Sequence, residues 1–229
     1  PENLTLNSIT GEILGKPLNS DVGSYFVNIT ATDISSLFVS QGFDLEIINV
    51  NDTPEFIEII PNQSFEEDVA LNFFVNQYFS DEDGDALTFT TLDLPGSLIL
   101  DLDTGEISGT PLNEDVSSYS ISITATDGSG AFVSQEFNLE ITNTNDSPVI
   151  AESIPSQSFE EDAIVNFGIS QYFSDEDGES LTFSTSDLPD TLTLDLDTGI
   201  ISGTPLNGNV NSYSISITAT DGSGAFVSQ

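Results

Sequence analysis

The sequence predicts an all-β protein, built from tandem β-sandwiches that are joined end to end. Apolar and polar residues alternate over short segments, which is the pattern of half-buried β-strands. Turn signals separate these segments every 8–14 residues, and no stretch of ten or more residues shows helical periodicity. The whole pattern then recurs at a fixed period, so one folding unit is expected several times along the chain.

The repeat is visible in single residues and in longer alignments. Tyr25, Tyr119 and Tyr213 lie 94 residues apart, and 61 of 84 positions are identical between residues 52–135 and residues 146–229. This period suits an autonomous domain of about 100 residues. We expect the last half of a repeat at 1–51 (repeat one), a complete repeat at 52–145 (repeat two), and a repeat lacking its last strand at 146–229 (repeat three). Repeats that are cut at both ends predict an excerpt of a longer array.

The strands of repeat two follow from the sequence in order. "LNFFV" (71–75) and "ALTFTTL" (86–92) each place apolar residues at alternate positions. "SLILDLDTGEISG" (97–109) predicts two short strands around a turn at 103–105, where Asp supports the turn and Gly allows a positive φ. "YSISITATDGSG" (119–130) and "EFNLEIT" (136–142) supply the last two strands, and Tyr119 stands where a tyrosine corner would lie. About seven strands indicate a sandwich, with an expected core of Phe73, Phe89, Leu100, Tyr119, Ile121, Ile123, Ala125, Phe137 and Leu139.

The composition limits the function classes. The chain has 39 acidic residues against one basic residue, Lys16, and no His, for a formal charge of −38. Nucleic acid and anionic membranes require basic patches, so neither is an expected partner, and small cations are. A hydrophobic content of 37% with 16 Phe indicates a globular chain. The absence of Cys excludes disulfides and thiolate metal sites, and no apolar segment is long enough to insert in a membrane. No signal peptide is visible, and the opening "PENLTL" without Met leaves room for one upstream.

The densest acidic stretch is "FSDEDGDALTF" at 79–89, which returns as "FSDEDGESLTF" at 173–183. Four carboxylates within five positions repel one another unless a cation lies between them. Ca²⁺ takes six to eight hard oxygen ligands, and a D-x-D-G turn presents carboxylates at close spacing. The stretch therefore predicts a calcium site. A solvated acidic surface, selected for solubility or high salt, is the alternative.

Four motifs together carry a resemblance over essentially the whole chain: "SDEDGD", "DTGEISGTP", "TATDGSG" and "NTNDSP". They resemble the cadherin-like, dystroglycan-type repeats of large bacterial surface adhesins. The resemblance implies seven-stranded, Ig/cadherin-like Greek-key β-sandwiches whose junctions bind Ca²⁺. It also implies a secreted or cell-surface, extracellular and bacterial protein.

The resemblance also implies the metal ligands. "NTNDSP" (143–148) is similar to the cadherin linker motif, and "NVNDTP" (49–54) repeats it, although Asn stands at 49 and 143 where cadherins carry Asp. "LNED" (112–115) matches a cadherin acidic motif loosely, and repeat three reads "LNGN" there. Glu67 lies 13 residues after Pro54 at the place of an acidic residue that reaches the next junction, and its counterpart is Glu161. The implied ligands are Asn49, Asn51, Asp52, Thr53, Asp81, Asp83, Asp127, Glu67, Asp115, Asn143, Asn145, Asp146, Ser147, Asp175, Asp177 and Asp221.

Two functions fit these observations. The repeats are either calcium-rigidified extender modules of a surface adhesin or filament, acting as a structural rod, or calcium-dependent binding modules for carbohydrate or for other copies of the protein. Near-identity of successive repeats favours the rod, and the absence of Trp weakens the carbohydrate hypothesis. Enzymatic function is not expected, because His and Cys are absent and the carboxylates recur at turns. The expected partners are calcium ions and the neighbouring repeats of the same chain.

Overall fold

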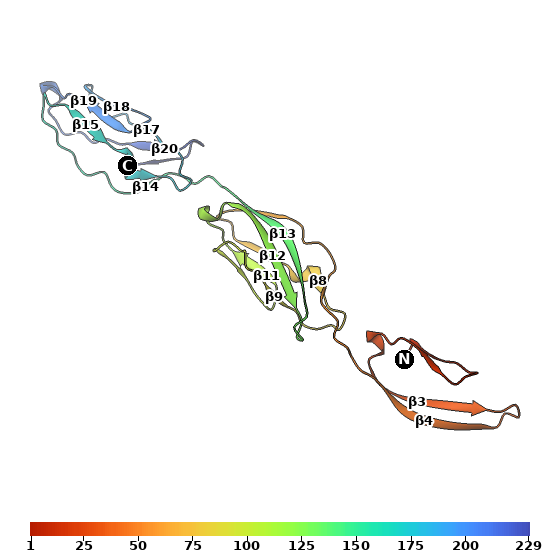
Figure 1. The fold of residues 1–229 in the computed structure, drawn as a ribbon. Coiled ribbons are helices and arrows are strands. Elements are labelled where there is room, and N and C mark those ends of the chain that lie inside the picture. The colour runs from red at the N-terminus through yellow and green to blue at the C-terminus, as the bar shows by residue number, and fades with distance from the viewer. The chain divides into compact units, whose positions relative to one another are not determined.

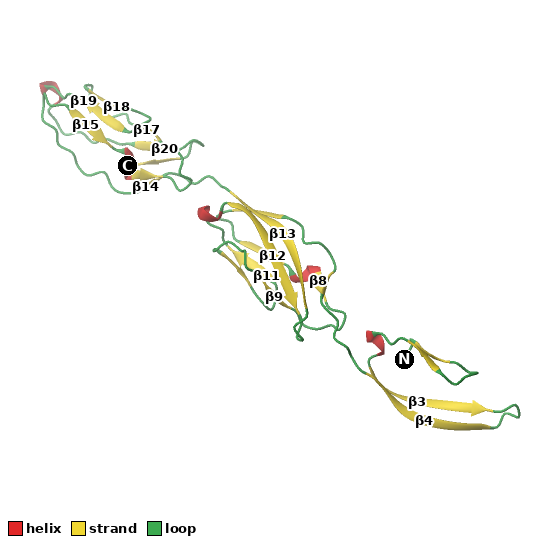
Figure 2. Ribbon diagram, in the orientation of Figure 1, coloured by secondary structure: helices red, strands yellow, loops and turns green.

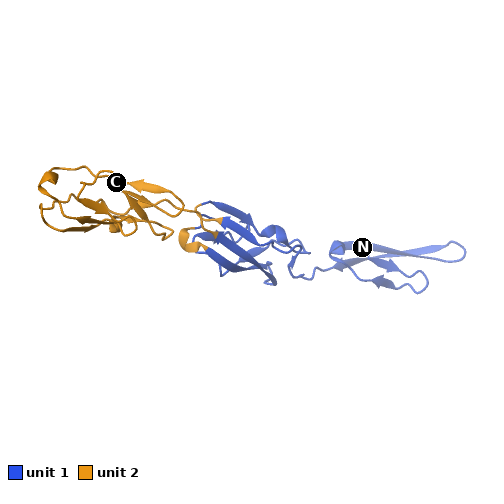
Figure 3. Cartoon of the chain, turned by 90° about the horizontal axis from the view of Figure 1, so that it is seen from above, with its two compact units in different colours: residues 1–65, 69–111, 117–141 blue, residues 66–68, 112–116, 142–229 orange.

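The computed structural model describes residues 1–229 as 21 short strands and five single-turn 3-10 helices (Figure 2). The chain separates into two compact units (Figure 3). Unit 1 comprises residues 1–65, 69–111 and 117–141, and unit 2 comprises residues 66–68, 112–116 and 142–229. No helix reaches the length and apolarity that a membrane crossing requires.

Unit 1 begins with four strands and one helical turn. β1 (Leu4–Leu6) pairs with β2 (Ile13–Gly15), η1 (Asn19–Asp21) follows, and β3 (Gly23–Thr32) forms a long antiparallel hairpin with β4 (Phe38–Ile47) (Figure 1). None of the hydrophobic side chains in residues 1–51 is buried. These strands therefore enclose no core of their own.

The β-sandwich of repeat two lies in the remainder of unit 1, except for residues 66–68, 112–116 and 142–145, which belong to unit 2. Strands β10, β11 and β7 form one sheet, and β6, β13, β12 and β9 form the other, so the predicted seven-stranded, all-β sandwich is confirmed. A short extra pair, β5 with β8, was not predicted. The bounds are β5 (Glu55–Phe56), β6 (Gln63–Glu66), β7 (Leu71–Phe74), η2 (Asn76–Tyr78), β8 (Phe79–Ser80), β9 (Thr88–Thr90), β10 (Leu98–Leu100), β11 (Glu106–Gly109), η3 (Asn113–Asp115), β12 (Ser117–Thr126) and β13 (Phe132–Thr142).

The core of this sandwich follows from the alternation along β12 and β13, which lie side by side (Figure 1). Ile121 faces Phe137 in the register of the two strands, and both side chains are buried. A shift by one residue would turn this apolar set to solvent, so the predicted register is confirmed. Of the expected core, Phe89, Ile121, Ile123, Ala125, Phe137 and Leu139 are buried, and Phe73, Leu100 and Tyr119 are half-buried. Val75, an alternating apolar residue of "LNFFV", is buried as well. The core also includes Ile60, Phe79, Leu98 and Ile107, which were not predicted.

The turn between β10 and β11 has the expected chemistry. Asp101 Oδ1 accepts the backbone N–H groups of Asp103 (3.1 Å) and Thr104 (2.8 Å). The hydrogen bonds from Thr104 lower the pKa of Asp101 below its ordinary value. Gly105 closes the turn at φ 68°, a left-handed conformation that favours glycine. Asp101 is thus explained by the turn without a metal.

Unit 2 holds repeat three, whose core is formed by Ile169, Phe173, Phe183, Ile201, Ile217 and Ala219. Its sheets are β15-β19-β18, β17-β20-β21 and the pair β14-β16. Tyr213 donates its hydroxyl to the carbonyl of Asn209 (3.1 Å), and Tyr25 makes the same bond to Asp21 (2.9 Å), as in a tyrosine corner. The bounds are β14 (Val149–Ile150), β15 (Val165–Gly168), η4 (Ser170–Tyr172), β16 (Phe173–Ser174), β17 (Thr182–Ser184), β18 (Leu192–Leu194), β19 (Ile200–Gly203), η5 (Asn207–Asn209), β20 (Thr218–Thr220) and β21 (Phe226–Ser228).

Candidate metal sites at the two linkers

The first linker, residues 49–53, lies within unit 1 and is held by the acidic loops of repeat two. Asn51 Nδ2 donates to Asp127 Oδ2 (2.8 Å), and the backbone N–H of Asp52 donates to Asp83 Oδ2 (2.6 Å). Asp81 Oδ1 in turn accepts the N–H of Asp83 (2.9 Å), which fixes the turn after β8. The linker and two loops that are 44 residues apart in sequence therefore converge on one point.

The loop of Asp127 is fixed by its own carboxylate. Asp127 Oδ1 accepts the N–H groups of Ser129 and Ala131, each at 2.8 Å, across the turn that joins β12 to β13. The second oxygen, Oδ2, accepts a hydrogen bond from the side-chain amide of Asn51. This amide is the main reason that the pKa of Asp127 lies below its ordinary value. Asp127 therefore remains ionised at neutral pH beside the linker.

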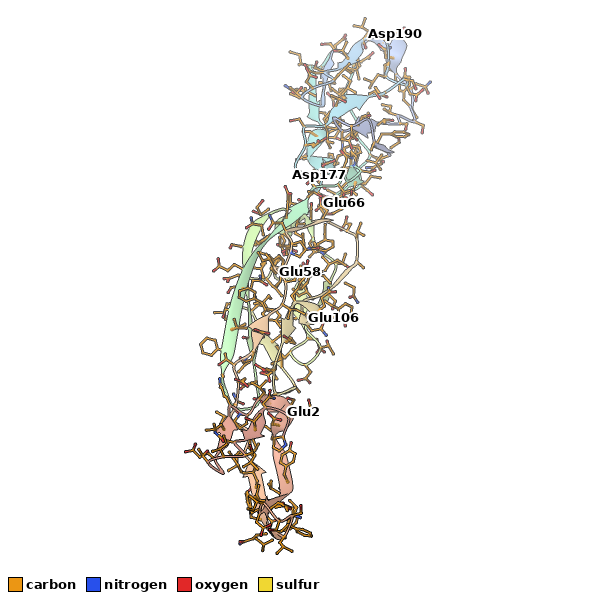
Figure 4. The ribbon with its side chains drawn as sticks, turned by 90° about the vertical axis from the view of Figure 1, so that its right-hand side faces the viewer. Glu2, Glu58, Glu66, Glu106, Asp177 and Asp190 are labelled. Atoms are coloured by element: carbon orange, nitrogen blue, oxygen red, sulfur yellow. The ribbon has the colours of Figure 1, made fainter.

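The second linker, residues 143–147, repeats this arrangement inside unit 2. Asn145 Nδ2 donates to Asp221 Oδ2 (3.0 Å), and the N–H of Asp146 donates to Asp177 Oδ2 (2.7 Å). Asp175 Oδ1 accepts the N–H of Asp177 (3.0 Å), and Asp177 is labelled in Figure 4. The pKa of Asp221 is lowered, again chiefly by the amide of the linker asparagine.

Several buried carboxylate oxygens at these linkers have no hydrogen-bond donor. They are Asp81 Oδ2 and Asp83 Oδ1 at the first linker, and Glu67 Oε2, Asp146 Oδ2, Asp175 Oδ2 and Asp177 Oδ1 at the second. A buried oxygen of an ionised group without a donor is costly, and native structures ordinarily supply a partner. The same two oxygens of the D-x-D pair lack a donor at both linkers. Hard oxygens of this kind are what Ca²⁺ binds, so the residues present fit that ion.

Glu67 connects the end of β6 to the second linker. Its side chain is 0% exposed, its Oε1 accepts the N–H of Thr144 (2.8 Å), and its Oε2 has no partner. The backbone N–H of Glu67 donates to the carbonyl of Thr142 (3.0 Å). Glu66–Asp68 accordingly belong to unit 2, with the linker and repeat three.

The electrostatics of the second linker show accumulated negative charge. Burial raises the pKa of Asp146, and the charges of Asp68, Asp177 and Asp175 raise it further. Like charges that shift a neighbour in this way repel one another in the metal-free protein. A bound divalent cation would reverse the sign of that interaction.

The structure brings together most of the expected ligands but not all. It groups Asn51, Asp52, Asp81, Asp83 and Asp127 at the first linker, and Glu67, Asn145, Asp146, Asp175, Asp177 and Asp221 at the second. The exposed residues Asn49, Thr53, Asn143, Ser147 and Glu161 lie outside these hydrogen-bond networks. Their metal-binding roles, like those of the grouped residues, stay predictions.

Asp115 has a structural use in the metal-free protein. Its Oδ2 accepts the N–H of Leu112 (3.0 Å), which closes the single turn η3. In repeat three Asn209 Oδ1 accepts the N–H of Leu206 in the same way (3.0 Å). A neutral amide makes the same bond at this position, so the cap itself does not require a carboxylate. The metal-binding role of Asp115 stays a prediction.

Three neighbours of the sites were not predicted as functional. Asp85 lies with Asp81 and Asp83 so that one carboxylate oxygen from each falls within 4.8 Å of the others. Its i, i+2, i+4 spacing in "SDEDGD" was the available signal. Asp68 acts on Asp146 through its charge. Asn19 Nδ2 donates to Asp52 Oδ2 (2.8 Å), a contact over 33 residues for which the sequence holds no signal.

Known proteins share the fold and parts of the sequence. A "Serine-rich adhesin for platelets" from Staphylococcus aureus (strain USA300) is 29% identical over 157 residues, which are 69% of this chain and 7% of that adhesin. The chain therefore matches only a small part of the curated relative. The solved structure of human CDH23 EC21-23 shares 20% identity at a TM-score of 0.60, covering 99% of this chain and 80% of that one. Mouse Cadherin-23 EC22-24 also shares 20% identity, at a TM-score of 0.53, covering 100% and 80%. At this identity both structures show the fold alone.

A family model gives the assignment. The model described as "Putative Ig domain" matches three successive segments, residues 1–48, 53–142 and 147–229. These segments span most of the chain and recur in the order of the sequence repeat. The chain belongs to the "Putative Ig domain" family, which it matches three times in tandem.

Proposed function

We propose that residues 1–229 are calcium-rigidified extender repeats of an extracellular adhesin or filament, with repeat boundaries near residues 51/52 and 145/146. One observation carries the proposal. Each linker gathers buried carboxylate oxygens that have no donor, and the atoms of the D-x-D pair that lack a donor are the same in both copies. Scattered surface acids would be hydrated, whereas these oxygens are buried and have no donor.

The chemistry of the donors selects the ion. The second site offers carboxylates from Glu67, Asp146, Asp175 and Asp177, and no His or Cys exists in the chain to attract a softer metal. Ca²⁺ accepts many oxygens in flexible geometry, whereas Mg²⁺ requires a near-ideal octahedron and retains its water. When bound, the ion supplies positive charge that joins the linker to the loops on either side.

The mechanical role follows from the linker itself. Thr144, Asn145 and Ser147 are exposed, so the linker has little apolar surface to bury. In the metal-free protein, carboxylates repel around Asp146 and favour an open linker. With Ca²⁺ the same carboxylates hold the linker, which would make successive repeats a stiff array. The adhesin named above supports a surface location, as does the cadherin-like fold.

A second function is favoured by the name of that relative, which describes an adhesin for platelets. Each repeat would then be a calcium-dependent binding module for carbohydrate or for another copy of the protein. A glycan array and a pull-down with residues 52–145, each with calcium and with chelator, test this function. Calcium-dependent capture by that single repeat would support it over the spacer role. No catalytic role is proposed.

Small-angle X-ray scattering on the 229-residue chain tests the rod. We expect the largest dimension to be greater in calcium than in chelator, and the Asp175→Asn/Asp177→Asn variant to resemble the chelated protein even in calcium. The matched control is Asp187→Asn/Asp190→Asn, which removes the same charge from exposed positions of the same repeat. An equal largest dimension in all samples would show that calcium does not stiffen the chain and that these acids are ordinary surface residues. Calorimetric titration with Ca²⁺ separates a failure of binding from a failure of stiffening.

A further inference from the structure

In repeat three, a single side chain joins the two acidic loops that face the second linker. Glu179 lies two residues after Asp177, the last member of the D-x-D pair. Its Oε2 accepts the backbone N–H of Gly222 (2.9 Å), which follows Asp221 in the turn between β20 and β21. The contact spans 43 residues and lies entirely within unit 2. The loop of the D-x-D pair and the loop of Asp221 are therefore fastened to each other.

With this contact, carboxylates hold the whole turn that follows Asp221. Asp221 Oδ1 accepts the N–H groups of residues 223–225 at 2.9, 2.7 and 2.8 Å. The N–H of Gly222 is directed to Glu179 instead. Each of the four successive N–H groups thus has a carboxylate acceptor. Because Asp221 is only 6% exposed, this turn fixes the place of a buried carboxylate.

Repeat two shows the same loops without the contact. Asp85 stands at the position of Glu179, and its side chain is one methylene shorter. The carboxylate of Asp85 lies with those of Asp81 and Asp83, and one oxygen of each falls within 4.8 Å of the others. The three counterpart acids of repeat three form no such group. The longer side chain therefore leaves the acidic group that the shorter one joins.

The glycine after the buried aspartate reflects the same difference. A Cβ atom placed on Gly222 would lie 3.2 Å from Oε2 of Glu179, whereas one on Gly128 would meet no atom within 4 Å. The N–H of Gly130 in repeat two is directed to the backbone carbonyl of Asp127 (3.3 Å), and not to its carboxylate. The turn of repeat two is therefore held by fewer charged hydrogen bonds.

A separate observation marks the second linker as a ligand site independently of these loops. Glu67, at the end of β6, is 0% exposed, and its Oε2 has no donor. A buried ionised oxygen of this kind needs a partner, which a cation supplies. The loops that Glu179 joins carry further oxygen donors for the same ion, on Asp175, Asp177 and Asp221.

We propose that Glu179 positions the calcium site of the second linker without being a ligand. By holding Gly222, it keeps Asp221 at a fixed place relative to the D-x-D pair, so less order has to be imposed when the ion binds. The inference rests on the calcium function proposed above. In repeat two the shorter Asp85 adds a carboxylate and leaves the turn free. This one position therefore sets how each copy of the site responds to calcium.

Calorimetric titration of the 229-residue chain with Ca²⁺ tests this role. The parent chain carries Asp81→Asn/Asp83→Asn, so that the site at the second linker is titrated alone. Glu179→Ala removes the contact, and we expect calcium binding to weaken about three- to tenfold. Glu179→Gln keeps a carbonyl that can accept the N–H of Gly222, and we expect its Kd to lie within about twofold of the parent's. Equal weakening in both variants would make Glu179 a ligand and overturn the positioning role.

Hydrogen exchange of the Gly222 amide in chelator measures the contact directly. In the natural chain we expect this amide to exchange at least about threefold more slowly than that of Gly128, and Glu179→Ala should abolish the difference. Glu179→Asp should also release the amide. It should nevertheless bind calcium about tenfold more tightly than Glu179→Ala, because the shorter carboxylate joins the D-x-D pair as Asp85 does. Unchanged exchange of Gly222 in Glu179→Ala would overturn the proposal.

The two measurements separate this inference from the proposed function. A parent chain that binds no Ca²⁺ would refute the proposed function and with it any positioning of a calcium site, and the exchange of Gly222 would still show whether Glu179 holds the loop. Calcium binding with the same affinity in the parent and in all three Glu179 variants would leave the proposed function standing and refute the role of Glu179.

Discussion

Replacing Glu67 by Gln should change stability in opposite directions with and without calcium. The side chain is 0% exposed, and its Oε1 accepts the N–H of Thr144 at 2.8 Å. A glutamine carbonyl can keep that hydrogen bond. The substitution removes a buried negative charge whose second oxygen has no donor. In chelator we therefore expect the variant to be more stable by about 0.5–2 kcal/mol, the scale of an unsatisfied polar group set against a weakened charged hydrogen bond.

With calcium the sign reverses, because a ligand is lost. Binding stabilises the folded state by RT ln(1 + [L]/Kd), or about 2.7 kcal/mol at a free calcium concentration of roughly 100 Kd. A tenfold weaker Kd at the same concentration leaves about 1.4 kcal/mol, so about 1.3 kcal/mol of the stabilisation by calcium disappears. The variant should therefore respond to calcium less than the natural chain does.

Thermal unfolding followed by circular dichroism, in calcium and in chelator, measures both effects. Glu161→Gln is the matched control, since Glu161 is the exposed counterpart in repeat three. We expect Glu161→Gln to change the midpoint of thermal unfolding little, both in calcium and in chelator. If Glu67→Gln lowers the midpoint equally with calcium and with chelator, Glu67 is a structural residue and the metal argument at the second linker is wrong.

Three further predictions concern the core, the acid response and the first linker. Ile121→Ala should cost about 2–5 kcal/mol in urea unfolding because its side chain is 0% exposed, whereas Ile215→Ala, at 37% exposure, should cost no more than about half as much; equal costs would contradict the difference in burial between the two side chains. Because the pKa of Asp127 is lower in the folded protein than in the unfolded chain, its ionised carboxylate stabilises the fold at neutral pH. This stabilisation is lost as the pH falls below the ordinary pKa of an aspartate and through the lowered pKa of Asp127. Asn51→Ala removes the main cause of that shift, so stability in chelator should fall at neutral pH and become less sensitive to acid; an unchanged profile would contradict this account. Asp85→Asn should weaken calcium binding at the first linker by up to about tenfold, because the Asp85 carboxylate lies with those of Asp81 and Asp83. An unchanged calcium affinity in calorimetry would show that Asp85 is not a ligand.

The parts of the fold that were predictable are those with a local signal. Alternation placed Ile121 and Phe137 inside, because successive side chains on a strand point to opposite faces. The turn after Asp101 followed from Asp and Gly chemistry that acts within five residues. The acidic loops could be placed near the linkers because the resemblance supplied the topology. The pairing of residues 55–56 with 79–80 was missed, since it depends on the folded sandwich and has no sequence pattern of its own.

The finer contacts of the candidate sites were outside the reach of the sequence for a similar reason. Asn19 bonds to Asp52 across 33 residues, and an asparagine in a 3-10 turn has many ordinary uses. The capping role of Asp115 was visible only when its bond to Leu112 could be compared with that of Asn209. Which oxygen of an acid is satisfied, as for Asp146, is a property of the folded chain alone.

The turn that Asp127 closes also bears on how a string of nearly identical repeats folds correctly. Adjacent repeats share 61 of 84 aligned residues, so each last strand has close copies nearby with which its partner strand could mispair. The turn spans only the five residues between β12 and β13, and one carboxylate oxygen holds the N–H groups of Ser129 and Ala131. Closing such a short loop is far quicker than bringing together strands about one repeat apart. The same aspartate that faces the linker thus favours pairing of strands within one repeat over pairing between neighbouring repeats while the chain folds.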